Sequence, residues 1–309
     1  MLYEFDFLSS NERDKVQAWF YVPATDPVGI VQLVHGFGEH SRRYLHMISS
    51  FLDDGFIVVA DDHIGHGKTA VVNDSWGHWG DKGVAMMVED EKTLHDLAVK
   101  EFPDLPYFFF GHSMGSVITR QFISRYGDLL NGAILCGTCG SDLDLATPKA
   151  IYEKVIAEGR ALETSEEALT AFFGGLFDRL DEVKYGNEWI CHDPWVQADH
   201  AKDPMNAFTK PTDNESMLTF IEMIEEITSD KWYEDVPAEL PIYLIAGDQD
   251  PFGSYGSGVY ETANKLIAAG HTDVTTLLYS GLRHEIHNYK EYMDEVECGV
   301  LDFMDEHLE

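Results

Sequence analysis

The segment Gly111-His112-Ser113-Met114-Gly115 places a serine between two glycines in the pattern G-x-S-x-G. It follows the apolar run Tyr107–Phe110 and precedes a segment with helical spacing that begins near Met114. A serine on a sharp strand-to-helix turn presents its hydroxyl at a helix N-terminus, where free N–H groups can bind an oxyanion. The pattern therefore predicts Ser113 as the nucleophile of a serine hydrolase.

A serine hydroxyl is a weak nucleophile, so it needs a base and a carboxylate that orients the base. The apolar run Ile242–Ala246 leads into Asp248 and Asp250. Both follow the end of a predicted strand, where sheets of this kind build their sites. We predict Asp250 as the acid because it lies further beyond the strand. Asp248 is the alternative and is typical of a turn.

The predicted base is a histidine in the loop after the next strand. The run Val274–Tyr279 leads into this loop, which contains His284. The chain order serine, acid, histidine is typical of one class of serine hydrolase. His287 and His271 remain alternatives. We expect His287 at the surface or beside the site near the last helix, and His271 at the wrong end of the sheet.

A second loop offers backbone donors for a negatively charged oxygen. His35-Gly36-Phe37-Gly38 follows the apolar run Ile30–Val34, and its glycines allow N–H groups to point inward. We predict the N–H groups of Phe37 and Met114 as the two donors of an oxyanion hole. His35 is expected to orient this loop through hydrogen bonds.

Two further clusters suit metal or redox chemistry but are predicted to be structural. Asp61–Gly67 contains two aspartates and two histidines, yet Gly65 and Gly67 indicate a tight turn. Cys136 and Cys139 form a C-x-x-C string without a second cysteine pair at ligand spacing. We expect no metal and no cofactor.

The elements that must position these residues alternate between strands and helices. Apolar strands between amphipathic helices predict a mostly parallel central sheet flanked by helices, with an antiparallel edge formed by Leu2–Leu8 and Ala18–Val22. The alternation stops near residue 142 and resumes near residue 236. We therefore predict an α/β core from residues 1–141 and 236–309, with residues 142–235 as a helical cap.

The predicted cap contains one strongly apolar segment. Ala168–Leu180 is predicted to be a helix with most of its large apolar side chains on one face. We interpret Phe173 and Phe177 on this face as substrate-binding residues of an acyl pocket. Packing of the same face against the core is the alternative.

Composition excludes several classes of function. The chain of 309 residues has 21 basic and 55 acidic side chains, a net charge of -34. This charge disfavours nucleic acids and anionic membrane surfaces as partners. The N-terminus is not typical of a signal peptide, and no apolar run reaches the ~18 residues of a membrane span. We expect a cytoplasmic protein, with at most transient lipid contact through the cap.

Taken together, these strings resemble the monoacylglycerol lipase and lysophospholipase group of α/β hydrolases. The resemblance rests on HGFGEHSRRY (35–44), DDHIGHGKT (61–69), GHSMGS (111–116), GDQDPF (247–252) and GLRHEIHN (281–288). It implies the α/β-hydrolase fold, Ser113 as nucleophile, Asp250 as acid, His284 as base, and Phe37 and Met114 as oxyanion donors. In the cap it is limited to the string HDPWV.

The expected reaction is hydrolysis of a small acyl ester, such as a monoacylglycerol or a lysophospholipid, through an acyl-enzyme on Ser113. An aminopeptidase or amidase on the same fold is one alternative. It needs an acidic anchor for an amine, which Glu163, Glu166 or Glu167 could supply. A ligand-binding protein with low turnover is the other.

Overall fold

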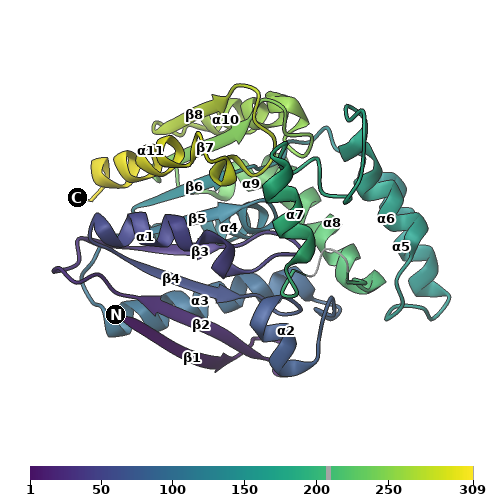
Figure 1. The fold of residues 1–309 in the computed structure, drawn as a ribbon, viewed down its shortest axis with the longest axis horizontal. Coiled ribbons are helices and arrows are strands. Elements are labelled where there is room, and N and C mark those ends of the chain that lie inside the picture. Colours follow the sequence, from purple (N-terminus) through teal and green to yellow (C-terminus); the bar gives the residue numbers. More distant parts are fainter. Residues whose placement is uncertain (207–209, 309) are drawn as a thin grey trace.

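One eight-stranded sheet runs through the molecule, with the strand order β1-β2-β4-β3-β5-β6-β7-β8 (Figure 1). The computed structural model describes residues 1–206 and 210–308. The strands are β1 (Leu2–Leu8), β2 (Lys15–Tyr21), β3 (Gly29–Val34), β4 (Phe56–Asp62), β5 (Tyr107–His112), β6 (Gly132–Cys136), β7 (Ile242–Gly247) and β8 (Val274–Tyr279).

Strand direction follows the predicted pattern. β2 pairs antiparallel with both β1 and β4, whereas β3 to β8 pair in parallel, for example Val31 with Val58 and Phe108. The parallel strands β3 to β7 are buried along their whole length, which explains their continuous apolar runs. The predicted mostly parallel sheet is confirmed. Because β2 lies between β1 and β4, only β1 of the two predicted edge strands is at an edge of the sheet, and β8 forms the other edge.

Helices cover both faces of this sheet. α1 and α11 contact each other on one face, and α3 and α4 contact each other on the other (Figure 1). α10 packs against β7 and β8. The helices of this part are α1 (Leu45–Asp53), α2 (Gly67–Asn73), α3 (Gly83–Glu101), α4 (Met114–Tyr126), α10 (Ser257–Ala269) and α11 (Met293–Glu306).

The chain between β6 and β7 is helical and contains no strand among its described residues. Figure 1 shows α5 and α6 side by side beyond the carboxyl ends of the parallel strands, with α7 between them and the sheet. The helices are α5 (Ala146–Ala157), α6 (Glu166–Phe173), α7 (Pro194–Lys202), α8 (Asn214–Thr228) and α9 (Asp230–Asp235). The predicted cap range also includes residues 207–209, which lie outside the described residues.

The single helix predicted over Ala168–Leu180 is wrong. α6 begins after Ser165, whose side chain accepts a hydrogen bond from the N–H of Ala168, and ends at Phe173. A short 3-10 helix, Gly174–Phe177, follows. Two consecutive glycines, Gly174 and Gly175, explain the break because glycine loses the most backbone entropy in a helix.

Among the described residues, we find no helix with both the length and the apolar character needed to span a membrane.

Candidate active site

Ser113 lies on the sharp turn between β5 and α4. Its backbone has φ 56° and ψ -120°, an unusual conformation for a residue with a side chain. The turn needs glycine at both flanks: a Cβ on Gly115 would lie 2.0 Å from the carbonyl oxygen of Val34, and one on Gly111 would lie 2.5 Å from that of Gly115. The two glycines of the G-x-S-x-G pattern are therefore required for the conformation of this turn.

Asp250 and His284 meet in the buried interior of the site. Nδ1 of His284 donates to Oδ2 of Asp250 at 2.8 Å, and Oδ1 of Asp250 accepts the N–H of Phe252 at 2.9 Å. Asp250 is fully buried. The alternative acid, Asp248, instead accepts the N–H of Gly281 at 2.7 Å and holds the turn after β8. The structure thus pairs His284 with Asp250 and not with Asp248.

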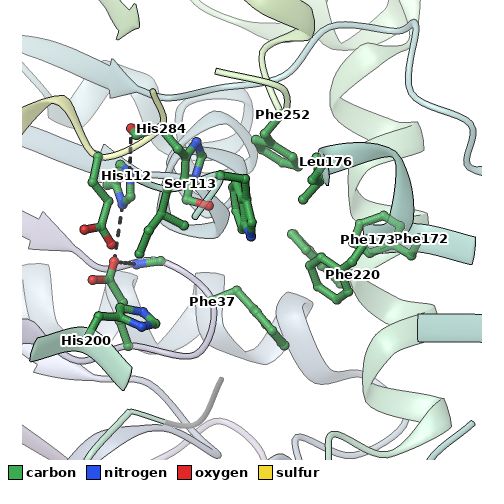
Figure 2. A pocket seen from close by; sticks show the side chains of 15 residues that line it. Phe37, His112, Ser113, Phe172, Phe173, Leu176, His200, Phe220, Phe252 and His284 are labelled. Atoms are coloured by element: carbon green, nitrogen blue, oxygen red, sulfur yellow. Dashed lines mark hydrogen bonds and ion pairs between the residues drawn. The ribbon is translucent and has the colours of Figure 1, made fainter. Parts of the chain in front are cut away.

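The second ring nitrogen of His284, Nε2, has no hydrogen-bond partner among the described residues. His284 and Ser113 line the same small cavity, and Figure 2 shows the two side chains side by side. With its proton on Nδ1, the ring carries a lone pair on Nε2 and can accept the proton of a hydroxyl. This is the arrangement that a general base for Ser113 requires.

The two alternative histidines lie outside this arrangement. His287 was expected at the surface or beside the site, but it is fully buried. Its ring stacks on Tyr44 at 4.9 Å and contacts His112 at 4.7 Å. Burial, followed by the charge of His112, holds the pKa of His287 well below its usual value. His271 precedes β8, as predicted, and does not line the cavity of Ser113.

The loop after β3 packs directly against Ser113, the predicted nucleophile. A Cβ on Gly36 would lie 3.0 Å from Cβ of Ser113, so this close approach requires glycine. Phe37, the next residue, lines the cavity of Ser113. Met114 is the first residue of α4, so its N–H has no carbonyl in a preceding turn to bond. Both predicted oxyanion donors thus belong to segments that flank Ser113.

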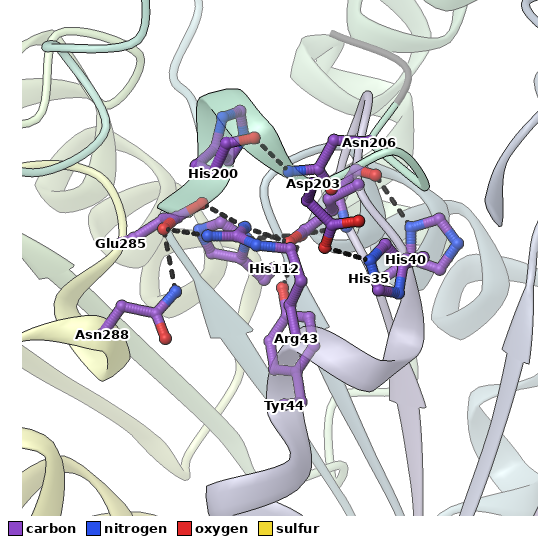
Figure 3. A network of polar contacts seen from close by, with 12 residues as sticks. His35, His40, Arg43, Tyr44, His112, His200, Asp203, Asn206, Glu285 and Asn288 are labelled. Carbon is purple, nitrogen blue, oxygen red and sulfur yellow. Dashed lines mark hydrogen bonds and ion pairs between the residues drawn. The ribbon is translucent and has the colours of Figure 1, made fainter. Parts of the chain in front are cut away.

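A buried network of charges connects the loops around the site (Figure 3). Arg43 donates to Glu39 at 2.6 Å and to both carboxylate oxygens of Glu285 at 2.6 and 2.8 Å. Glu39 accepts the N–H of Gly36 at 2.7 Å, and His112 lies 3.3 Å from both Glu39 and the carbonyl of His284. The network therefore joins the Gly36 loop, the nucleophile turn and the His284 loop.

The charges in this network balance one another. Burial would raise the pKa values of both Glu39 and Glu285. The hydrogen bond from His112 and the charge of Arg43 instead hold the pKa of Glu39 well below its usual range. Arg43 does the same for the pKa of Glu285. Burial would lower the pKa of His112, yet its hydrogen bond and charge interaction with Glu39 raise it. Both carboxylates thus face Arg43, and Glu39 also contacts His112, which offsets the cost of burying them.

The cavity of Ser113 is almost filled by side chains. Its volume is about 20 Å³, and aromatic rings from the chain between β6 and β7 close its outer side (Figure 2). The prediction from the sequence did not include two residues that line this cavity. They are Trp189, whose ring lies 4.7 Å from that of His284, and Phe220 on α8. Aromatic residues in a helical insertion were the available signal, but nothing in the sequence showed which ones turn inward.

A second cavity, of about 350 Å³, lies on the other side of three of these rings. Phe37, Phe173 and Trp189 line both cavities, whereas Phe177 lines only the outer one. The rings of Phe37 and Phe173 are 5.4 Å apart. Of the two predicted substrate-binding residues, Phe173 therefore faces Ser113 and Phe177 does not.

Other reactive clusters lie outside this cavity. Burial raises the pKa of Cys136 well above its usual value and that of Cys139 to about 11, so both thiols of the C-x-x-C string are held protonated. They form no disulfide. Three groups in the described chain could geometrically hold a metal ion: His112, Cys136 and His287; Asp61, His63 and Glu91; and His78, Asp213 and Glu215.

Comparison with known proteins agrees with this geometry. The family model described as serine aminopeptidase, S33, matches residues 25–291. A monoacylglycerol lipase of Mycolicibacterium smegmatis is 26% identical over 291 residues, 91% of each chain. A solved thermostable carboxyl esterase from Bacillus coagulans, in complex with glycerol, is 49% identical with a TM-score of 0.96 and covers 100% of this chain and 99% of its own.

A solved lipase in its open form is 39% identical with a TM-score of 0.94, and covers 100% of this chain and 99% of its own. These likenesses extend over the whole sheet and the helices between β6 and β7. They confirm the predicted α/β-hydrolase fold and the predicted resemblance to monoacylglycerol lipases. Because the family model spans most of the chain, this protein belongs to the serine aminopeptidase S33 family of α/β hydrolases.

Proposed function

We propose that this protein is a serine esterase or lipase that hydrolyses small acyl esters, with Ser113, His284 and Asp250 as its catalytic triad. One observation carries the proposal: a fully buried Asp250 orients His284, whose unpaired Nε2 shares a cavity with the strained Ser113. The esterase and lipase relatives support the ester as the bond that is cleaved.

The reaction follows from this arrangement. His284 removes the proton of the Ser113 hydroxyl as its oxygen attacks the acyl carbonyl. The N–H groups of Phe37 and Met114 stabilise the negative charge on the carbonyl oxygen. His284 then protonates the departing alcohol, leaving the acyl group on Ser113. Water, activated by the same histidine, releases the acid, and no step needs a cofactor.

The helices between β6 and β7, within residues 142–235, act as a cap that selects the substrate. A cavity of about 20 Å³ is far smaller than the ~300–1,000 Å³ typical of ligand sites. The apolar outer cavity of about 350 Å³ is large enough and lies behind Phe173. An acyl chain, such as that of a monoacylglycerol or a lysophospholipid, therefore displaces Phe173 and extends along Phe177.

An aminopeptidase activity receives less support from the site, despite the description of the family. Glu163, Glu166 and Glu167, the anchors considered from the sequence, do not line the cavity of Ser113. Glu39 and Glu285 do line it, but both are paired with Arg43. A substrate amine thus finds no available carboxylate among the described residues that line the cavity.

The proposal is tested with paired substrates and a Ser113→Ala variant. Wild-type protein should react with a fluorophosphonate probe and hydrolyse p-nitrophenyl esters of increasing acyl length, while aminoacyl p-nitroanilides should remain intact. Ser113→Ala should lose both labelling and turnover. Wild-type protein that cleaves the anilides faster than the esters would replace the esterase with an aminopeptidase. Folded wild-type protein that neither labels nor turns over would favour a binding protein.

A further inference from the structure

Two stacked histidines lie behind the loop that carries Phe37. The rings of His35 and His63 are 3.8 Å apart and inclined by 21°. The backbone N–H of His63 donates to Nε2 of His35 at 3.0 Å, so this nitrogen must carry a lone pair. The proton of a neutral His35 ring therefore lies on Nδ1. That nitrogen is 2.8 Å from the carbonyl oxygen of Gly36 and donates to it.

This hydrogen bond fixes the direction of the Phe37 N–H. The Gly36 carbonyl and the Phe37 N–H belong to one peptide group, which is planar and has its C=O and N–H pointing in opposite directions. Because the carbonyl faces the ring of His35, the N–H of Phe37 points away from that ring. The Gly36 N–H is held separately by Glu39 at 2.7 Å. Both peptide groups around Gly36 are thus anchored by side chains.

A second buried histidine, His63, lies between His35 and two acidic side chains. His63 lies with Nδ1 at 3.1 Å from the carboxylate of Asp61 and 3.2 Å from that of Glu91, and its Nε2 donates to the carbonyl of His35 at 3.1 Å. All four side chains are buried. Burial opposes charge on His63, but Asp61 and then Glu91 raise its pKa well above the usual value.

The charge on His63 in turn acts on His35. Burial, followed by the positive charge of His63, holds the pKa of His35 well below its usual value. Asp61 and Glu91 thus favour the charged form of His63, and a charge on His63 disfavours one on His35. Burial, followed by the charge of Glu91, raises the pKa of Asp61 itself to about 7. A protonated His35 would have to place an N–H on Nε2 against the N–H of His63, and the two donors would repel.

We propose that His35 is the positioning residue of the oxyanion hole, and that Asp61, His63 and Glu91 hold it as the neutral tautomer that aims the Phe37 N–H at the substrate oxygen. This inference rests on the proposed roles of Ser113 and Phe37. It gives a function to the Asp61–Gly67 segment, whose residues otherwise take no part in the reaction.

The test compares two substitutions of His35. In His35→Asn, the amide nitrogen occupies the place of Nδ1 and can still donate to Gly36. In His35→Leu, no donor remains. We expect His35→Leu to lower kcat by about 10²- to 10³-fold, the usual effect of losing one oxyanion donor, with KM within about threefold of wild type. His35→Asn should restore most of that loss.

A spectroscopic readout separates positioning from general structural damage. An alkyl trifluoromethyl ketone forms a hemiketal on Ser113, and ¹⁹F NMR titration gives the pKa of its oxygen. A weakened oxyanion hole should raise this pKa in His35→Leu by about two units, since a 10²-fold loss corresponds to about two pKa units. The titration needs only Ser113 and the oxyanion hole, so it reports on His35 even if the ester substrates fail.

Glu91→Gln provides a second variant should the His35 variants be unstable. It should lower kcat and raise the hemiketal pKa in the same direction, while Asp90→Asn, a change at the neighbouring buried acid, should do neither. A loss of kcat in His35→Leu without a change in the hemiketal pKa would overturn the inference. So would one equivalent of bound divalent metal that Glu91→Gln removes, because the cluster would then hold an ion in place of a proton.

Discussion

Asp250→Asn tests whether Asp250 sets the proton position on His284. The N–H of Phe252 requires an acceptor 2.9 Å away, so the amide oxygen of the new side chain would take the place of Oδ1. The amide NH₂ group would then take the place of Oδ2, 2.8 Å from Nδ1 of His284. Two N–H donors cannot share that contact, so His284 must move its proton from Nδ1 to Nε2. Nε2 can then no longer accept the proton of Ser113.

The expected loss follows from this change of tautomer. Trapping the catalytic histidine in the wrong tautomer lowers kcat on the order of 10⁴-fold in serine hydrolases, which equals about 5 kcal/mol in the activation barrier. Stability should change little, because both hydrogen bonds of the buried side chain keep a partner. The assay measures kcat and KM on p-nitrophenyl butyrate together with the rate of fluorophosphonate labelling, and a thermal melt of each variant.

Asp248→Asn is the matched control on the same loop. Its amide oxygen can still accept the N–H of Gly281, so its kcat should stay within about threefold of wild type. A folded Asp250→Asn variant that retains more than about a tenth of the wild-type kcat would refute the reasoning. An equal loss in both variants would do the same, because the effect would then come from the loop and not from the tautomer.

Three further changes test the pocket, the turn and a buried acid. Phe173→Ala should join the two cavities and raise the preference for octanoyl over butyryl esters about tenfold, which is equivalent to burying about two more methylenes. Phe177→Ala, in contrast, should not raise kcat on short esters. Gly115→Ala should lower the melting temperature strongly, since its Cβ would lie 2.0 Å from the Val34 oxygen and overpacking of this kind typically costs ~1–3 kcal/mol or more. Burial raises the pKa of Asp90 to about 6, so the folded protein binds its proton more tightly than the unfolded chain. The free energy of unfolding of wild type should therefore fall by up to about 3 kcal/mol relative to that of Asp90→Asn as the pH rises from 4 to above 6. Guanidinium unfolding measures both values, and a difference between them that does not change with pH would contradict the raised pKa of Asp90.

The parts of the site that the sequence predicts are those determined by local pattern. The turn at Ser113 needs glycine at 111 and 115 for steric reasons, so the motif and the conformation are inseparable. The buried strands are recognisable because both of their faces are apolar. The ends of parallel strands meet at one edge of the sheet, which is why the positions of Asp250 and His284 after their strands predict that both approach Ser113.

The remaining features depend on contacts between distant segments. Arg43 and Glu285 are separated by 242 positions, and no local pattern marks them as partners. Trp189 lies in a loop between short helices. In a loop, no helical or strand periodicity of the sequence predicts which way a side chain points. The break in the Ala168–Leu180 helix was predictable from Gly174 and Gly175, but the continuous apolar spacing across them favoured one helix.

The contacts of the proposed cap favour one part of it as the part that opens for substrate. The segment before α7 is bound to the His284 loop by polar contacts: Glu285 donates its N–H to the carbonyl of Ile190 at 2.7 Å, and Arg283 donates to that of Glu188 at 2.6 Å. α6 faces the core through apolar contact, with Phe173 on Phe37. Hydrogen bonds fix direction, whereas apolar contacts allow sliding.

We therefore expect α6 to move while the segment at 188–190 stays with His284, the proposed general base. Such a division lets substrate enter without disturbing the Asp250–His284 pair, because the His284 loop and its cap contacts move as one unit. Backbone amides of α6 should exchange with deuterium faster than those of Glu188–Ile190, and a bound alkyl trifluoromethyl ketone should slow only the α6 exchange. Equal protection of the two segments in the free protein would argue for a cap that moves as a whole.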